Sequence, residues 1–210
     1  MKLSRIVCAV LFLIFSLSVV FADIADILAD HVPMPENTFP MYEMNIKAGF
    51  DFDGKYDVRE NISGTGLKSF NTGNNLSFAA EYIRYYTHYV GIGGGISAQI
   101  LRRLNDFPGK FGFAPAYLSL KVRSWPQEPG LYGYIFGHLG YNLFYGDFKL
   151  ENNYDAKDGG LYYAAGIGMI YKYFLLEGMY SVNEGSAESA KSGRADIEYR
   201  KFTISAGYKL

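Results

Sequence analysis

Three histidines are the side chains of this sequence best suited to proton transfer: His31, His88 and His138. A general base needs a nucleophilic serine or an acidic group held beside its imidazole. Only His138 lies in a segment that we expect to form a strand, and no neighbouring residue pattern marks it as a base. We therefore predict a polar structural role for His138, no catalytic residue and no enzymatic activity.

Two further stretches invite a ligand-binding interpretation. GIGGGI at 91–96 is rich in glycine, but it departs from the dinucleotide fingerprint and no helix pattern follows, so a glycine-lined strand face is expected. YGDFKLENNYDAKD at 145–158 offers carboxylate and amide oxygens without the spacing of a calcium loop, which favours a solvated loop. Cys8 is the only cysteine, so a thiolate site or disulfide is excluded. We predict neither a metal nor a cofactor.

The N-terminal residues 1–22 have the pattern of a secretory signal peptide. Lys2 and Arg5 precede an apolar run that ends in VFA, whereas a retained membrane anchor, the alternative, would be longer and followed by basic residues. Cleavage would leave 18 basic and 21 acidic residues, a net charge of −3, which gives no indication of nucleic-acid binding. We interpret 23–40 as a periplasmic N-terminal segment with a short helix.

From residue 41 onward, apolar and polar residues alternate with the two-residue period of a β-strand. Between 41 and 52 every second residue is apolar, and the last ten residues, KFTISAGYKL, repeat the pattern. The 19 Tyr, 16 Phe and 24 Gly also favour strands and tight turns. The alternation predicts eight strands, at about 41–58, 74–86, 89–104, 113–125, 131–144, 159–171, 174–183 and 196–210.

The connections between these strands are of two kinds. Long polar connections are expected at 59–73, 105–112, 145–158 and 184–195, and short ones at 87–88, 126–130 and 172–173. Long loops at one end and short turns at the other are typical of a transmembrane β-barrel. We therefore predict an all-β fold, an eight-stranded antiparallel up-and-down transmembrane β-barrel over 41–210, with both of its ends on the short-turn side.

Alternation alone also fits a soluble secreted barrel that encloses an apolar ligand. Three features favour the membrane: charges of both signs in mid-strand, small residues on the same polar face, and aromatic residues near the strand ends. We therefore expect the apolar rows to face lipid and the polar rows to face the lumen. The predicted lumen charge network consists of Lys47, Glu81, Lys121, Glu177 and Lys201.

The region from 41 onward resembles the small eight-stranded outer-membrane barrels of the OmpA transmembrane-domain and OmpX type. The resemblance rests on GIGGGI at 91–96, AYLSLKVR at 116–123, AAGIGMIY at 164–171 and the final ISAGYKL, in this order along the chain. It implies a Gram-negative outer membrane and insertion by the barrel-assembly machinery. Family members typically end in Phe, whereas this chain ends in Leu210 with Tyr208 two residues before it. The implied insertion signal comprises Phe202, Ile204, Tyr208 and Leu210.

The resemblance also implies roles in adhesion, surface protection or membrane integrity, carried by four long loops that contact host or cell-surface ligands. The wall-anchoring role of full-length OmpA is not implied, because no peptidoglycan-binding domain follows. We expect a monomer with outer-membrane lipid as its surroundings and no nucleic-acid partner. The alternatives are a small pore or a ligand-binding barrel and, less favoured, a lipid-modifying barrel enzyme.

Overall fold

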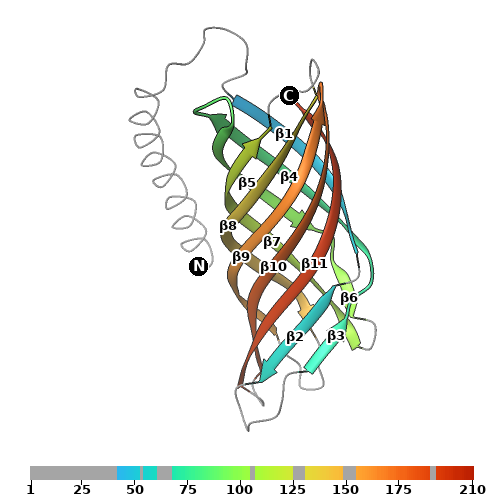
Figure 1. The fold of residues 1–210 in the computed structure, drawn as a ribbon. Helices are drawn as coiled ribbons and strands as arrows, with labels where there is room; N and C mark the ends of the chain where they lie inside the picture. Colours follow the sequence, from blue (N-terminus) through green and yellow to red (C-terminus); the bar gives the residue numbers. More distant parts are fainter. Residues whose placement is uncertain are drawn as a thin grey trace.

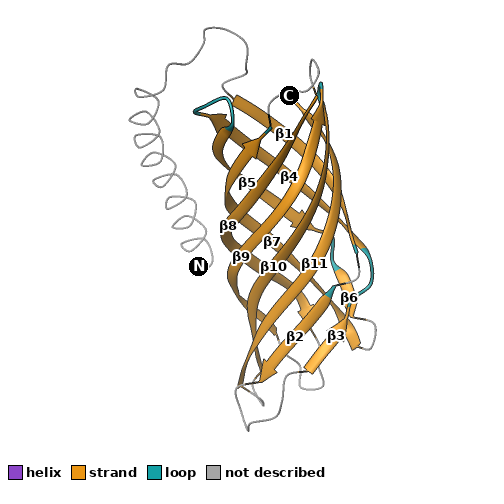
Figure 2. Cartoon of the chain, viewed as in Figure 1, coloured by secondary structure: helices purple, strands orange, loops and turns teal. Residues whose placement is uncertain are grey.

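The protein is described here from a computed structural model in which every described element of regular structure is a β-strand (Figure 2). The structure describes residues 42–52, 54–60, 68–104, 107–124, 131–148, 155–189 and 193–210. Within these residues there is no helix of the length and apolarity needed to cross a membrane. The predicted signal peptide and the segment 23–40 lie outside the described residues, so both stay predictions.

The strands follow one another in a single sheet that closes into a barrel (Figure 1). They are β1 (Tyr42–Asp51), β2 (Lys55–Glu60), β3 (Lys68–Asn71), β4 (Asn75–Tyr85), β5 (Val90–Gln99), β6 (Arg102–Leu104), β7 (Phe107–Arg123), β8 (Leu131–Phe148), β9 (Asp155–Tyr171), β10 (Phe174–Ser189) and β11 (Gly193–Lys209).

Eight antiparallel strands form the wall, because three of them are interrupted. β11 pairs with β1 up to Asp51↔Thr203 and with β2 from Lys55↔Arg200, so β1 and β2 act as one strand of the wall. In the same way β3 continues as β4, and β5 as β6. Pairing of β1 with β11 closes the ring. The predicted eight-stranded up-and-down barrel is confirmed.

Two of the predicted strands are interrupted in the structure, so the prediction of continuous strands there was wrong. The strand at 41–58 breaks between Asp51 and Lys55, and the strand at 89–104 breaks at Ile100 and Leu101. The first break changes which residues face inward: odd-numbered ones in β1, but Tyr56 and Val58 in β2. An irregularity of this kind shifts the two-residue register by one, and an alternation pattern does not reveal it.

The predicted long loops were wrong in extent, because much of 59–73, 105–112, 145–158 and 184–195 is strand. β3 lies within the first of these, and β7 to β11 extend into the others. The reason is visible in β11, where Tyr199 and Lys201 both face inward while Glu198 and Phe202 both face outward. Along this one strand the apolar residues thus change from the inner face to the outer face. The apolar–polar alternation is interrupted where they change, so the sequence pattern does not indicate a continuous strand there.

Short turns and the chain end share one end of the barrel, hereafter the turn end. Residues Tyr86–Tyr89 form one turn there, and Lys172 and Tyr173 form another, with φ of 57° at Lys172. The left-handed conformation is what a two-residue hairpin requires. Leu210 donates its N–H to the Met44 carbonyl at 2.8 Å, which places the C-terminus beside the start of β1, as predicted (Figure 1). The opposite end is the loop end.

Candidate functional site

We call the part of the barrel from the turn end to Asp51 and Lys201 the lower barrel, and the part beyond it, toward the loop end, the upper barrel; in Figure 1 the turn end points to the top of the view. The lower barrel has its polar residues inside and its apolar residues outside. In β1, Glu43 and Asn45 are fully buried, whereas Tyr42 and Ile46 are 61% and 53% exposed. The same alternation holds in β11, where Phe202 and Ile204 are exposed and Thr203 is buried. We call this outer surface the apolar belt. The predicted assignment of the two faces matches these burials.

Nearest the turn end, the lumen contains an ion pair that we call the inner cluster. Lys121 Nζ lies 2.7 Å from Glu43 Oε1, and both side chains are buried. Glu43 also accepts hydrogen bonds from Asn45 Nδ2 at 2.7 Å and from the Tyr85 hydroxyl at 3.1 Å. The guanidinium of Arg123 lies 3.8 Å from the centre of the Tyr85 ring. The inner cluster thus occupies the lumen near the turn end.

The middle cluster is formed by Lys47 between two carboxylates. Lys47 Nζ lies 2.6 Å from Glu81 Oε1 and 2.8 Å from Glu177 Oε2. Two tyrosine hydroxyls also bind these carboxylates: Tyr117 donates to Glu81 at 2.8 Å and Tyr134 donates to Glu177 at 2.7 Å. These residues come from β1, β4, β7, β8 and β10, so the cluster ties together opposite sides of the barrel.

The outer cluster has one carboxylate shared by two cations. Asp51 Oδ1 lies 2.6 Å from Lys201 Nζ, and Asp51 Oδ2 lies 2.6 Å from Arg102 Nη2. The hydroxyls of Thr203 and Ser77 donate to Asp51 Oδ1 at 2.8 and 3.0 Å. Asp51 is fully buried, and Arg102 and Lys201 nearly so.

Above the outer cluster the lumen changes to an apolar core, which we call the aromatic plug. Its members are Tyr56, Val58, Phe111, Phe113, Phe144, Ala187, Ala195, Ile197 and Tyr199. Phe113 and Tyr199 stack with ring centres 6.0 Å apart and planes 3° apart. Arg102 joins the two regions, because it also donates to the Tyr199 hydroxyl. Burial raises the pKa of Tyr56 and Tyr199, so the plug stays uncharged.

The structure places all five residues of the predicted lumen network inside the barrel, but in three separate clusters. Lys47, Glu81 and Glu177 meet in the middle cluster, while Lys121 and Lys201 pair with Glu43 and Asp51. Sequence reasoning missed Arg102, because strict alternation from the outward-facing Ile100 places it outside. The break at Ile100 and Leu101 turns it inward.

His138 lies in the lumen between aromatic rings. Its ring stacks on Tyr117 with centres 4.2 Å apart, and Nε2 lies 3.3 Å from Glu81 Oε1. His88 lies in the turn Tyr86–Tyr89, and its carbonyl accepts from Arg123 Nε at 2.7 Å. His31 is outside the described residues. Across the described ranges, no group of three or more histidine, cysteine or acidic side chains is arranged to hold a metal ion.

The residues of the predicted insertion signal lie in a row on the outside of β11 and at its end. Phe202, Ile204, Tyr208 and Leu210 are all exposed. Tyr208 packs against Tyr173 and Phe174, with ring centres 5.8 and 5.7 Å away. The row therefore faces the surroundings of the barrel beside its closing seam. Its recognition by an assembly machinery stays a prediction.

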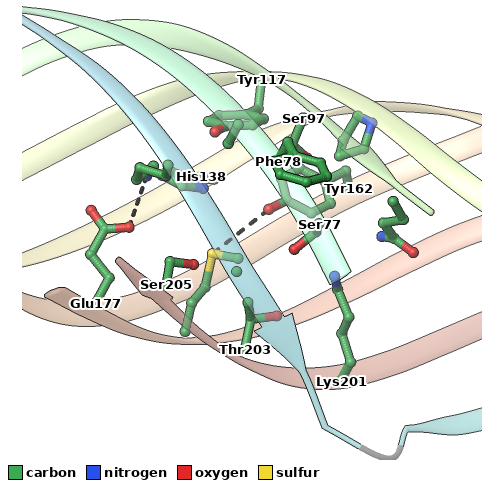
Figure 3. A pocket seen from close by; sticks show the side chains of 16 residues that line it. Ser77, Phe78, Ser97, Tyr117, His138, Tyr162, Glu177, Lys201, Thr203 and Ser205 are labelled. Atoms are coloured by element: carbon green, nitrogen blue, oxygen red, sulfur yellow. Dashed lines mark hydrogen bonds and ion pairs between the residues drawn. The ribbon is translucent and has the colours of Figure 1, made fainter. Parts of the chain in front are cut away.

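A small cavity of about 30 Å³ separates the middle and outer clusters. Figure 3 shows side chains that line it, with Glu177, Ser205 and His138 toward the left of the view and Ser77 and Lys201 toward the right. Gly49 faces it as well, and a methyl group there would come within 2.8 Å of Ser205 Oγ. The lack of a side chain at Gly49 thus leaves room for the cavity.

No protein-family model matches the sequence, and no curated protein matches it. Among solved structures, the outer membrane protein OprG from Pseudomonas aeruginosa is similar over 80% of this chain and 95% of its own, with 11% identity and a TM-score of 0.54. Neisserial surface protein A (80% and 97% covered, 13% identity, TM-score 0.48) and Ail of Yersinia pestis (81% and 100%, 15%, 0.45) are more distant in shape. The OprG likeness shows a shared fold, a small outer-membrane β-barrel. Membership of the OmpA and OmpX type stays a prediction.

Proposed function

We propose that the protein is a monomeric, non-conducting β-barrel of a bacterial outer membrane with a structural or surface-interaction role. The observation that carries this proposal is the divided interior: charge clusters within the apolar belt and an aromatic plug above it. We propose no enzymatic activity and no cofactor.

The apolar belt supports a membrane location. Exposed large apolar side chains occur on every strand of the lower barrel, among them Ile46, Phe78, Ile96, Ile135, Ile167 and Phe174. A soluble protein rarely exposes a continuous apolar surface of this kind, whereas lipid solvates it. A closed ring also leaves no unpaired strand edge in the hydrocarbon. Outer-membrane lipid is therefore the first partner, with the barrel-assembly machinery the second.

The sealed lumen argues against the pore alternative. An eight-stranded barrel has an interior that side chains can fill. Here Glu43 and Lys121 block the turn end, Lys47 bridges the centre, and the aromatic plug closes the loop end. A hydrated ion passing through would have to break a buried ion pair and displace the plug.

The part of the barrel above the belt supports a surface-interaction role. β10 and β11 remain paired as far as Ser189↔Gly193, eight residues beyond Lys201. At about 3.3 Å per residue this is roughly 25 Å along the strands. With an apolar core and charged outer residues such as Glu198 and Arg200, this part is built as a rigid, water-exposed platform. It would carry the connecting segments toward host or cell-surface ligands.

Membrane fractionation with gel electrophoresis tests the location. We expect the protein to stay in outer-membrane pellets after carbonate washing and to migrate differently before and after boiling, because a closed barrel resists detergent. Recovery as a soluble periplasmic monomer would overturn the proposal.

Recordings in planar lipid bilayers test the sealed lumen. We expect no single-channel steps from the wild type, and steady conductance would favour the pore alternative instead. For the surface role, residues 149–154 and 190–192 can be replaced by Gly-Ser segments of equal length. Reduced attachment of expressing cells to host cells, with unchanged barrel assembly, is the expected result; unchanged attachment would leave a structural role only.

A further inference from the structure

A hollow of about 330 Å³ lies on the outer wall of the upper barrel, where β9, β10, β11 and β2 run side by side (Figure 1). We call it the lateral hollow. Its volume falls in the range of small-molecule sites, ~300–1,000 Å³. The inward residues of β11 here, Ile197 and Tyr199, belong to the aromatic plug, so the charged residues that alternate with them face outward. The charged side chains that line the hollow are Asp57, Glu184, Arg194, Asp196, Glu198 and Arg200.

The lateral hollow lies at an irregularity of the wall. The register of β9 and β10 shifts between Asn183 and Gly185, so that β9 has one residue more than β10 there. Such a bulge leaves backbone groups without ladder partners. The buried side-chain amide of Asn142 donates to two of these groups from inside, the carbonyls of Leu161 and Glu184, both at 2.9 Å. Both lining residues of β9 are glycines, so no side chain of that strand fills the space.

Two carboxylates of the hollow have acceptor oxygens available. Asp57, Glu198 and Glu184 lie directly opposite one another on β2, β11 and β10. Arg200 donates to Glu198, but it lies 3.7 Å from Asp57, beyond hydrogen-bond distance. Among the described residues, no group donates a hydrogen bond to the carboxylate of Asp57 or Glu184, although Asp57 is only 7% exposed. Since buried carboxylates require donors, a ligand in the hollow has to supply them.

Sugar hydroxyls fit this lining better than a phosphate group. A hydroxyl both donates and accepts, so neighbouring hydroxyls of one ring can donate to Asp57 and Glu184 and accept from Arg194 and Arg200. A phosphate group supplies acceptors and negative charge, and it would leave the two carboxylates without donors. The mixture of carboxylates and guanidinium groups therefore favours a neutral, hydroxyl-rich ligand.

The lateral hollow also adjoins exposed apolar residues on its turn-end side. Leu161 directly follows the two glycines of β9 and is 45% exposed, and Tyr163 is 41% exposed. Tyr163 is in register with Val182, which in turn is in register with Arg200 of the hollow. Tyrosine is typical of the boundary between hydrocarbon and head groups. An amphiphile can thus place its head in the hollow and its chains along the apolar side chains below it.

We propose that the lateral hollow binds one sugar unit from the head group of a membrane glycolipid, with the acyl chains against the upper edge of the apolar belt. The inference rests on the proposed outer-membrane location. It adds a defined lipid site to the general contact between the belt and the bilayer.

Native mass spectrometry of the barrel released from lipid nanodiscs tests the proposal. The nanodiscs contain phosphatidylcholine with equal small fractions of monogalactosyl diacylglycerol, a neutral glycolipid, and phosphatidylglycerol, an anionic lipid without a sugar ring. We expect one retained glycolipid per barrel and an enrichment of about tenfold over phosphatidylglycerol, which corresponds to ~1.4 kcal/mol. Equal retention of the two lipids would overturn the site.

Two variants on one strand separate the hollow from the rest of the wall. Glu184→Ala removes a carboxylate of the hollow and is expected to abolish the enrichment. Glu188→Ala, at an exposed position of β10 outside the hollow, is the matched control and should keep it. If Glu188→Ala loses the enrichment as well, the selectivity does not come from the hollow and the proposal fails. Asp57→Asn, on a different strand, should also lower the enrichment, and it serves where Glu184→Ala does not fold.

A competition experiment identifies the source of the sugar. An excess of methyl galactoside, which has the same ring without acyl chains, should leave the glycolipid bound. Displacement by this soluble sugar would show that the chains contribute nothing, and the assignment to a membrane lipid would be wrong. The proposed function is tested separately, because a protein that does not enter nanodiscs as a folded barrel would refute the membrane location, whereas a folded barrel without enrichment refutes the lateral site alone.

Discussion

Removing one partner of the inner cluster should destabilise the barrel more than removing both. Glu43 and Lys121 are suited to this test because they form a one-to-one pair at 2.7 Å with both side chains buried. At an effective dielectric constant of about 20, their attraction is roughly 6 kcal/mol before desolvation is subtracted. Breaking such a pair typically costs about 3–5 kcal/mol, because the remaining charge is left buried without its counter-ion.

We therefore expect Lys121→Met to lower the free energy of unfolding by about 3–5 kcal/mol, and Glu43→Gln to lower it by a similar amount. The double variant should lose less than the sum of the two. The assay is urea unfolding in lipid vesicles, followed by circular dichroism and by mobility on unboiled gels. Lys172→Met, at an exposed position, should change stability by no more than about 0.5 kcal/mol.

The reasoning would be refuted by additivity. If the losses of the single variants sum to the loss of the double variant within about 0.5 kcal/mol, the two groups do not interact. Asn45 and Tyr85 also donate hydrogen bonds to Glu43. They should therefore make the loss of folding free energy in Lys121→Met smaller than it would be for a carboxylate without hydrogen-bond partners. A stabilising Lys121→Met variant would place this pair outside the low-dielectric lumen altogether.

Three further outcomes are expected. Ile204→Lys, on the exposed face of the belt, should cost about 2–4 kcal/mol in vesicle unfolding, and no loss would mean that the two faces are reversed. Deletion of Tyr208 to Leu210 should slow assembly in pulse-chase experiments far more than deletion of 190–192, whereas Leu210→Phe should assemble at least as fast as the wild type. Insertion of the truncated chain at the normal rate would show that these residues are not an insertion signal. Phe113→Ala should cost about 3–5 kcal/mol by opening a cavity in the plug, and an unchanged unfolding midpoint would contradict its role as core.

The lower barrel was predictable because one physical rule applies along all of its strands. Lipid outside and a narrow polar lumen inside require opposite residue types on successive positions, and Glu43, Lys47 and Phe202 follow that rule. Eight strands, their antiparallel order, the short turn at Lys172 and the inward position of His138 therefore followed from local pattern.

The upper barrel was not predictable in the same way, because there the apolar side chains lie inside the barrel and the charged ones outside, the opposite of the lower barrel. Above Lys201 the outward-facing residues include the charged Glu198 and Arg200, and rings such as Phe111 and Tyr199 form a core inside. The alternation changes phase there, so strands appear as loops. Nothing local in the sequence indicates at which residue the surroundings change.

Residue types along each strand thus carry the fold class, the number of strands and, in the lower barrel, the face that most side chains occupy, since these depend on neighbours two positions away. The grouping of charges into pairs does not follow from residue types. Arg102 and Asp51 are 51 positions apart, and Lys47 and Glu177 are 130 apart. Their meeting depends on strand register and on the break at Ile100 and Leu101. Closure of the ring brings β1 beside β11 and encloses the common interior in which these side chains meet.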